Sequence, residues 1–234
     1  MQFSLMSELR RHAGMHQVDL KSIEVIQDNY YTMEGSALRG TMIGGAKSAE
    51  VSIKIESNAS EETIGRLVRL AEASSPAHAM MRDALENTFS LKFNGHNTSV
   101  VDVNPSHAAP VQDPEETFFE SIQSTDDTTF LPDIISKLSD TEKVFGVEGG
   151  AGSSLHAEQK RTLHVHGEAR TMDGTLMETV VQPFKPMGSA FRFACDETIA
   201  AGGQESAPPP LMYLSAGVGF CYMTQIGRYA HITK

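Results

Sequence analysis

The chain carries two thiols, Cys195 and Cys221, in different sequence surroundings. A cysteine becomes a nucleophile or a redox centre when its surroundings lower the pKa of the thiol. Two cysteines make no disulfide framework, and the hydrophobic pattern predicts a strand around Cys195 and a helix around Cys221. The chemistry of each thiol therefore depends on the element that carries it.

The helix predicted around Cys221 covers residues 208–230. Its apolar residues recur at spacings of three, four and seven, the period of one helical face. They are Leu211, Leu214, Val218, Tyr222 and Tyr229. A run of prolines opens the helix, and the small residues at 215–217 and 219 favour close approach of another backbone. Because Cys221 lies on the apolar face, the pattern predicts a core helix with a buried thiol.

Two histidines, His164 and His166, alternate along a predicted strand and so share one of its faces. Such a pair can chelate zinc or copper, but it is also typical of the solvent face of a half-buried strand. We prefer the second interpretation, so neither a metal nor a cofactor is predicted. The chain has no Gly-x-Ser-x-Gly element of a serine hydrolase and no phosphate-binding glycine loop.

Charge is unevenly distributed along the chain. The formal net charge is -11 at pH 7, and residues 99–160 hold twelve acidic side chains against three lysines. The remainder is close to neutral, which gives no electrostatic argument for binding nucleic acid or an anionic membrane. No apolar run reaches the roughly 18 residues of a membrane span, and residues 1–8 lack the layout of a signal peptide. We therefore expect a globular cytoplasmic protein.

The chain divides into segments at residues 1–98, 99–160 and 161–234. The first is predicted to begin with a helix over residues 1–17 that is interrupted at Gly14. Its predicted strands are 21–31, 37–43, 50–56 and 89–93. Ser60 is the expected N-cap of a helix that runs to residue 75, and Pro76 either kinks this helix or opens a second one at 77–85.

The second segment, rich in proline, acidic residues and glycine, is predicted to be a linker or a long excursion with a helix at 131–145. It is either a solvated connector or a docking segment for a partner. The third segment returns to the strand pattern and ends in the helix around Cys221. Its predicted strands are 162–169, 174–183 and 189–195. Neither outer segment resembles a complete core alone.

The two ends of the chain match each other at an offset of 217 residues. The identical pairs are Phe3 with Phe220, Met6 with Met223, Arg11 with Arg228, and Ala13 with Ala230. Ser4 then falls opposite Cys221. The match is compatible with chance or with a structural repeat, in which case the chain begins and ends at the same point of that repeat.

Motifs in both outer segments carry a family resemblance. In the third segment these are Phe191-Arg192-Phe193, Asp196-Glu197, Gly202-Gly203, Pro209-Pro210-Leu211 and a helix with small residues ahead of a cysteine. In the first they are residues 51–62, 70–72 and Ser75-Pro76. Together, over about 18–95 and 161–234, they resemble the N-terminal and C-terminal halves of the OsmC/Ohr family. The halves come in reversed order, as in a permuted domain or the middle of a tandem pair.

The resemblance implies an α+β fold in which antiparallel sheets wrap long central helices of a homodimer or a tandem pseudo-dimer. It also implies reduction of organic hydroperoxides by a thiolate on the central helix, without a cofactor. Cys221 matches the attacking thiol, and Arg170 matches the arginine that stabilises the thiolate.

Two departures from the family pattern bear on this activity. Ser75 stands where the resolving cysteine is expected, and Leu211 or Met212 stands where an acid usually pairs with the arginine. Cys195 could substitute as the resolving thiol, or it is simply a buried apolar side chain. We therefore expect a single-cysteine peroxidase resolved by an external thiol. The alternative is a non-catalytic OsmC-like protein that binds a hydrophobic molecule or serves as a structural or stress-response module.

Overall fold

The computed structural model describes residues 1–36, 39–107, 131–140, 159–185 and 188–232. The chain forms two compact units, one made of Met1–Ala79 with Phe130–Lys234 and the other of Met80–Thr129. Helices and a large antiparallel sheet both contribute, so the predicted α+β class is confirmed. Among the described residues, no helix combines the length and the apolar character needed to cross a membrane.

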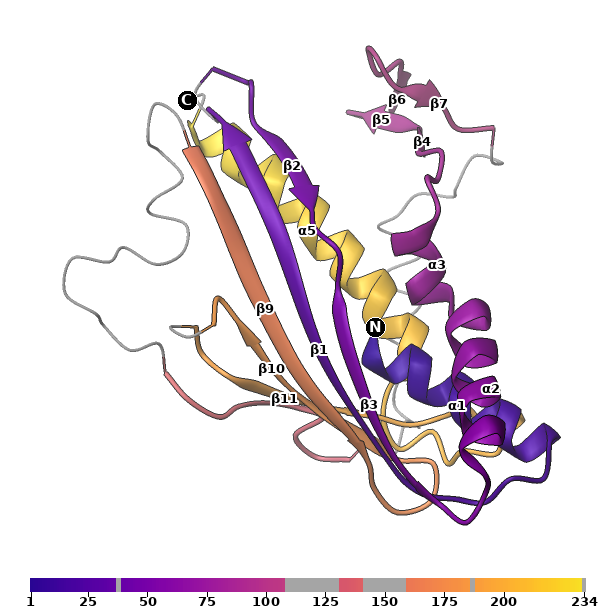
Figure 1. Cartoon of the computed structure of the whole chain (residues 1–234). Coiled ribbons are helices and arrows are strands. Elements are labelled where there is room, and N and C mark those ends of the chain that lie inside the picture. The colour runs from indigo at the N-terminus through magenta and orange to yellow at the C-terminus, as the bar shows by residue number, and fades with distance from the viewer. Residues whose placement is uncertain (37–38, 108–130, 141–158, 186–187, 233–234) are drawn as a thin grey trace. The chain divides into compact units, whose positions relative to one another are not determined.

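A sheet of seven strands organises the larger unit (Figure 1). Its strands are β1 (Leu20–Gly35), β2 (Ile43–Ala46), β3 (Glu50–Ser57), β8 (Ile135–Lys137), β9 (Gln159–Thr171), β10 (Met177–Pro183) and β11 (Phe191–Cys195). The order across the sheet is β2, β1, β9, β10, β11, β8, and β3 pairs with the first half of β1. The antiparallel pairing of β1 with β9 joins the first and third sequence segments in one sheet.

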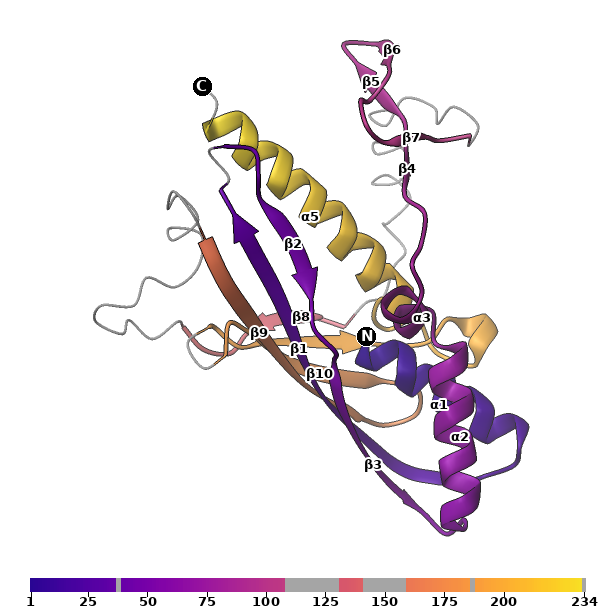
Figure 2. The ribbon, with the colours of Figure 1, turned by 45° about the horizontal axis from the view of Figure 1, so that its top comes forward.

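The helix α1 (Gln2–Met15) lies on one face of this sheet, beside α2 (Glu61–Ser74), as Figure 2 shows. It buries one apolar face, as its helical spacing predicts. Met6 and Leu9 are among the side chains that form a single core cluster with Ile23, Val25 and residues of α2. The predicted N-terminal helix is therefore confirmed, and it is the centre of the core, but the predicted interruption at Gly14 is wrong because α1 continues to Met15.

The side chains of β1 alternate between the two faces of the sheet. Ile23, Val25 and Gln27 are almost completely buried, and Nε2 of Gln27 donates to the sulfur of Met1 at 3.5 Å. The odd-numbered residues of this stretch thus face α1. Because successive side chains of a strand point to opposite faces, Asp28 and the other even-numbered residues face away from α1.

α2 begins where the sequence predicts, and a new helix follows it. Oγ of Ser60 accepts a hydrogen bond from the backbone N–H of Thr63 at 3.3 Å, which satisfies a donor of the first turn. Ser75 has an extended backbone, because proline disfavours the helical conformation of the residue before it. Of the two alternatives for Pro76, the structure shows the second: it opens α3 (Pro76–Arg82).

Two secondary-structure predictions are wrong in the described residues. Residues 39–40 form a turn, and β2 begins only at Ile43, where the sequence predicts a strand over 37–43. Gly35 has a φ of +101°, a conformation that permits this turn and leaves no room for a Cβ beside the carbonyl of Thr41. Residues 131–140 are not helical, because Ile135–Lys137 pairs with β11 at the edge of the sheet.

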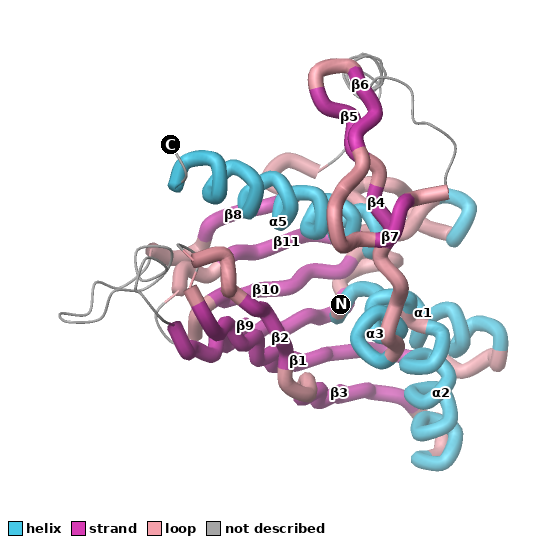
Figure 3. The backbone as a smooth tube through the Cα atoms, turned by 90° about the horizontal axis from the view of Figure 1, so that it is seen from above, coloured by secondary structure: helices cyan, strands magenta, loops and turns pink. Residues whose placement is uncertain are grey.

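The long helix α5 (Pro210–Ile232) begins at the end of the proline run, as predicted. Its Tyr213 ring packs against Phe3 and Phe193, each with a centroid distance of 5.9 Å. The contact with Phe3 places the start of α5 on the side of the sheet that also carries α1, and Figure 3 shows the rest of the helix extending away from α1. Among the described residues of α5, Tyr213 is the one that packs against the core cluster.

The smaller unit contains short strands. They are β4 (Thr88–Phe89), β5 (Leu91–Phe93), β6 (His96–Thr98) and β7 (Asn104–Pro105). β4 pairs in parallel with β7, and β5 pairs antiparallel with β6. The strand predicted at 89–93 is therefore divided between two pairs.

Candidate functional site

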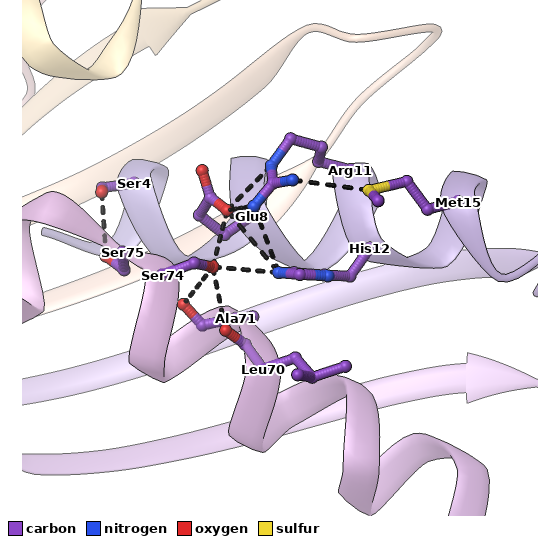
Figure 4. Close-up of polar contacts among 9 residues, drawn as sticks. All are labelled: Ser4, Glu8, Arg11, His12, Met15, Leu70, Ala71, Ser74 and Ser75. Atoms are coloured by element: carbon purple, nitrogen blue, oxygen red, sulfur yellow. Dashed lines mark hydrogen bonds and ion pairs between the residues drawn. The ribbon is translucent and has the colours of Figure 1, made fainter.

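Two buried serines meet where α1 packs against the end of α2 (Figure 4). Oγ of Ser4 lies 2.9 Å from Oγ of Ser75, and the two residues are 5% and 0% exposed. Oγ of Ser75 also lies 2.9 Å from Nδ1 of His78 on α3. Ser4 is placed here by the buried face of α1, and Ser75 by the backbone turn between α2 and α3. The polar groups thus link three helices.

A second polar cluster ties α1 to α2 beside these serines (Figure 4). Oγ of Ser74 donates to Oε2 of Glu8 at 2.7 Å and lies 3.0 Å from Nε2 of His12. Nε of Arg11 donates to the same carboxylate oxygen at 2.9 Å. Partial burial opposes ionisation of Glu8, but hydrogen bonds from Arg11 and Ser74 outweigh it and hold the pKa below its ordinary value. Glu8 is thus kept as a carboxylate that anchors α1.

The chemistry open to Ser4 and Ser75 is limited by their burial. A hydroxyl within hydrogen-bond reach of an imidazole can be activated as a nucleophile. Here Ser75 is fully buried and Ser4 covers it, so a substrate cannot approach this hydroxyl in the described conformation. The pair satisfies two buried polar groups and stabilises the packing of α1 on α2.

Cys221 is exposed on α5, so the prediction of a buried thiol on a core helix is wrong for the described chain. Most side chains of residues 215–231 are exposed as well. Helical spacing identifies the side chains that share a face, but it does not say whether another element covers that face. Tyr213, in the first turn of α5, packs against the core cluster.

The matching residues at the two ends of the chain differ sharply in exposure. Phe3 (6%) matches Phe220 (66%), and Met6 (0%) matches Met223 (69%). At the same offset Leu9 (0%) stands opposite the similar side chain of Ile226 (68%). In α1 this face forms the core, whereas in α5 the equivalent face is open. Exposed apolar stripes of this kind are typical of interaction surfaces.

Arg170 lies on β9 and is engaged by a carboxylate of the same sheet. Its Nε donates to Oε1 of Glu178 on β10 at 2.7 Å. The next residue, Thr179, is buried and donates to Oε1 of Gln2 on α1 at 2.9 Å. Glu178 and Arg170 therefore lie on the opposite face of the sheet from α1. The structure does not bring Arg170 to Ser4 or Ser75.

Cys195 is buried at the end of β11, as its strand pattern predicts. Burial raises the pKa of its thiol, and the neighbouring carboxylates of Glu197 and Asp196 act in the same direction. A thiol of this kind is inert, since the thiolate is the reactive form. In the described structure Cys195 is thus an apolar core residue.

Sequence reasoning missed the role of Asp196, which organises the loop before α5. Its Oδ1 accepts from Oγ1 of Thr175 at 2.6 Å and from the backbone N–H of Glu197 at 2.8 Å. Its Oδ2 accepts from Oγ and the backbone N–H of Ser206 and from the backbone N–H of Gln204. Burial opposes ionisation, but these hydrogen bonds lower the pKa of Asp196 to about 2. An acid at the start of a loop that contains two glycines and a serine was the available signal.

The structure thus brings Ser4 to Ser75, while Cys221 and Arg170 lie on separate elements, α5 and β9. Comparisons of the chain with protein-family models, with curated proteins and with solved structures found no match. The OsmC-like assignment therefore stays a prediction that depends on the motifs and on the geometry described above.

Proposed function

We propose that this chain is an OsmC-like thiol peroxidase that reduces organic hydroperoxides through Cys221. The observation that carries the proposal is the contact between Ser4 and Ser75. Ser4 is the residue that the repeat aligns with Cys221, and Ser75 stands at the family's resolving position. These two positions are 71 residues apart in the sequence and 2.9 Å apart in space. The contact therefore supports both the alignment of Ser4 with Cys221 and the alignment of Ser75 with the resolving cysteine of the family.

The proposed reaction needs one thiolate and an external reductant. The thiolate of Cys221 attacks the protonated oxygen of the hydroperoxide, so that an S–O bond forms and the O–O bond breaks. The leaving oxygen takes a proton and departs as the alcohol, and Cys221 becomes a sulfenic acid. One external thiol then displaces water to form a mixed disulfide, and a second releases the Cys221 thiol. An external reductant is required because Cys195 is buried on β11.

We also propose that a second copy of the chain packs on the exposed apolar face of α5. The matching side chains of α1 are buried in the core. They show that a helix face of this composition can pack against other elements. A Cβ at Gly217 or Gly219 would meet no atom within 4 Å, so the α5 backbone is open to close approach. A symmetric contact between two α5 helices would bury the same apolar residues on both copies.

Arg170 is the proposed cation that stabilises the thiolate in the assembled protein. This role requires a different position of Arg170 in the assembled protein, because Arg170 is paired with Glu178 on the face of the sheet opposite α1 and the start of α5. Arg170→Gln should therefore slow formation of the sulfenic acid about tenfold or more at neutral pH. Arg192→Gln is the matched control, because Nη1 of Arg192 lies 3.4 Å from the same Glu178 carboxylate and has no proposed part in the reaction.

The decisive experiment is intact mass spectrometry after brief exposure to a stoichiometric aryl or fatty-acid hydroperoxide, with dimedone present to trap sulfenic acid. The adduct should form in the wild-type chain and in Cys195→Ser, and it should be absent in Cys221→Ser. With an external dithiol added, the wild-type chain should consume hydroperoxide catalytically. The proposal fails if Cys221 stays reduced while methionines oxidise slowly.

The assembly can be tested separately by light scattering over a range of concentrations. The wild-type chain should form a dimer, and Phe220→Asp should give a monomer with unchanged far-ultraviolet circular dichroism. A monomeric wild-type chain would contradict the second copy as the cover of α5. A monomer that still forms the sulfenic acid would separate the chemistry from the assembly.

One observation favours the non-catalytic alternative. Ser4 and Ser75 carry hydroxyl groups at the two positions where the family pattern has the attacking and the resolving thiol. The contact between Ser4 and Ser75 therefore has no redox chemistry. In that case the open apolar face of α5 would bind a hydrophobic molecule. A fluorescent fatty acid should then bind the wild-type chain and Cys221→Ser equally, and binding should be lost in Ile226→Asp.

A further inference from the structure

The face of the sheet that points away from α1 carries a cluster of metal-binding side chains. Asp28 lies on β1, and its partner across the ladder on β9 is His166. His164 lies two residues earlier on β9 and shares the same face. The antiparallel register between β1 and β9 fixes all three positions on two neighbouring strands.

Three potential ligand atoms converge at this point. They are Oδ1 of Asp28, Nε2 of His164 and Nδ1 of His166, all within 4.8 Å of one another. The carboxylate oxygen lies 2.5 Å from the His164 nitrogen and 2.7 Å from the His166 nitrogen. The three side chains are partly exposed, so water can reach the cluster. Imidazole and carboxylate are preferred ligands of Zn²⁺, and three protein ligands with one open position are a common zinc arrangement.

Neighbouring side chains hold both imidazoles in orientations that suit a cation. Nε2 of His166 lies 2.9 Å from Oε1 of Glu168. With Nε2 donating to this carboxylate, Nδ1 keeps its lone pair directed at the cluster, as metal-binding histidines require. The ring of Tyr30 stacks on His164 with a centroid distance of 4.7 Å, which restricts rotation of that imidazole.

The charge around the cluster is also suited to a cation. Glu50 on β3 is the cross-strand partner of Asp28, so its carboxylate is on the same face of the sheet. Asp28, Glu168 and Glu50 together place three carboxylates around two imidazoles. A divalent cation would reduce the repulsion among these carboxylates.

We propose that Asp28, His164 and His166 bind one Zn²⁺ ion per chain. The ion replaces the direct contacts between the carboxylate and the two imidazoles, and each ligand atom moves to about 2.0–2.2 Å from the metal. Water occupies the remaining position. This site lies on β1 and β9, so it is independent of the chemistry proposed for Cys221 on α5.

The test is isothermal titration of the metal-free full-length chain with Zn²⁺. One ion should bind per chain, and Asp28→Asn or His166→Ala should weaken binding by about tenfold or more. His96→Ala, which changes a histidine of the smaller unit, is the matched control and should bind as the wild-type chain does. Glu168→Gln should weaken binding less than loss of a ligand.

Titration with Co²⁺ gives an independent readout of the ligands. The visible spectrum of the bound cobalt should indicate nitrogen and oxygen ligands, without thiolate charge transfer, and should be unchanged in Cys221→Ser. The proposal is overturned if no ion binds, if Asp28→Asn and His166→Ala bind as the wild-type chain does, or if binding depends on Cys221. Because Asp28→Asn preserves side-chain shape, it decides the question even where a histidine variant does not fold.

Discussion

The hydroxyl groups of Ser4 and Ser75 lie 2.9 Å apart in the interior of the protein, between α1 and the end of α2. Each is a small polar group that the other satisfies in an environment of packed apolar side chains. Ser75 also reaches Nδ1 of His78, so the polar contacts extend to α3. Ser4 matches Cys221 in the repeat, and Ser75 matches the resolving cysteine expected from the family resemblance. These two positions are therefore neighbours in this fold.

Cysteines placed at these two positions should form a disulfide. In a Cys221→Ser background, Ser4→Cys combined with Ser75→Cys should lose two hydrogens on mild oxidation, because the side-chain tips are already in contact. Mass spectrometry of the alkylated protein gives the readout. The control pairs Ser4→Cys with Ser60→Cys, which lies at the opposite end of α2 and should stay reduced. Equal oxidation of both pairs would contradict the observed contact.

The two native thiols should react at very different rates. Cys221 is exposed, whereas Cys195 is buried and its pKa is raised by burial and by the adjacent carboxylates. Titration with a disulfide reagent at pH 7 should modify one thiol per native chain at once and the second only after unfolding, about a hundredfold or more slower. Cys221→Ser should remove the fast phase. A fast phase that persists in this variant would mean that Cys195 is accessible.

The methionine pair of the two chain ends offers a matched test of core and surface. Met6 is fully buried in α1, and Met223 at the equivalent position of α5 is 69% exposed. Met6→Ala should lower the free energy of unfolding by about 2–5 kcal/mol, the usual cost of such a core truncation. Met223→Ala should change it by about 0.5 kcal/mol or less in a monomer. Urea unfolding at low protein concentration measures both, and similar losses would mean that α5 is covered.

Acid should destabilise the protein through Asp196. Its pKa is lowered to about 2 in the folded state by hydrogen bonds from Thr175, Ser206 and backbone N–H groups, and it is close to 4 when unfolded. The stabilisation, roughly 2–3 kcal/mol, is therefore fully present above pH 4 and is lost as the pH falls towards 2.

Asp196→Asn should remove that pH-dependent part and lower the free energy of unfolding at pH 7. Unfolding in urea at a series of pH values between 7 and 2 is the measurement. Asp173→Asn is the control, because that residue is exposed and its substitution should leave the profile unchanged. If Asp196→Asn loses stability at low pH as the wild-type chain does, other carboxylates are responsible for the acid sensitivity.

Local patterns alone were sufficient to predict much of the secondary structure. The apolar face of α1, the cap at Ser60, the strands around β9 to β11 and the start of α5 after the prolines all follow from short-range steric and hydrogen-bonding preferences. The buried strand position of Cys195 follows in the same way. Predictions failed where a sheet edge captured a segment, as at Ile135–Lys137, and where a glycine turn displaced a strand after Gly35.

The arrangement of functional groups depends on long-range contacts that no local pattern contains. Asp28 and His164 are 136 residues apart, and only the register between β1 and β9 makes them neighbours. Ser4 and Ser75 meet because α1 packs on α2, and the exposure of Cys221 follows from which face of α5 the core leaves open. The periodicity of the sequence predicts which side chains share a face of a helix or strand. Packing between elements distant in the sequence decides whether that face is buried.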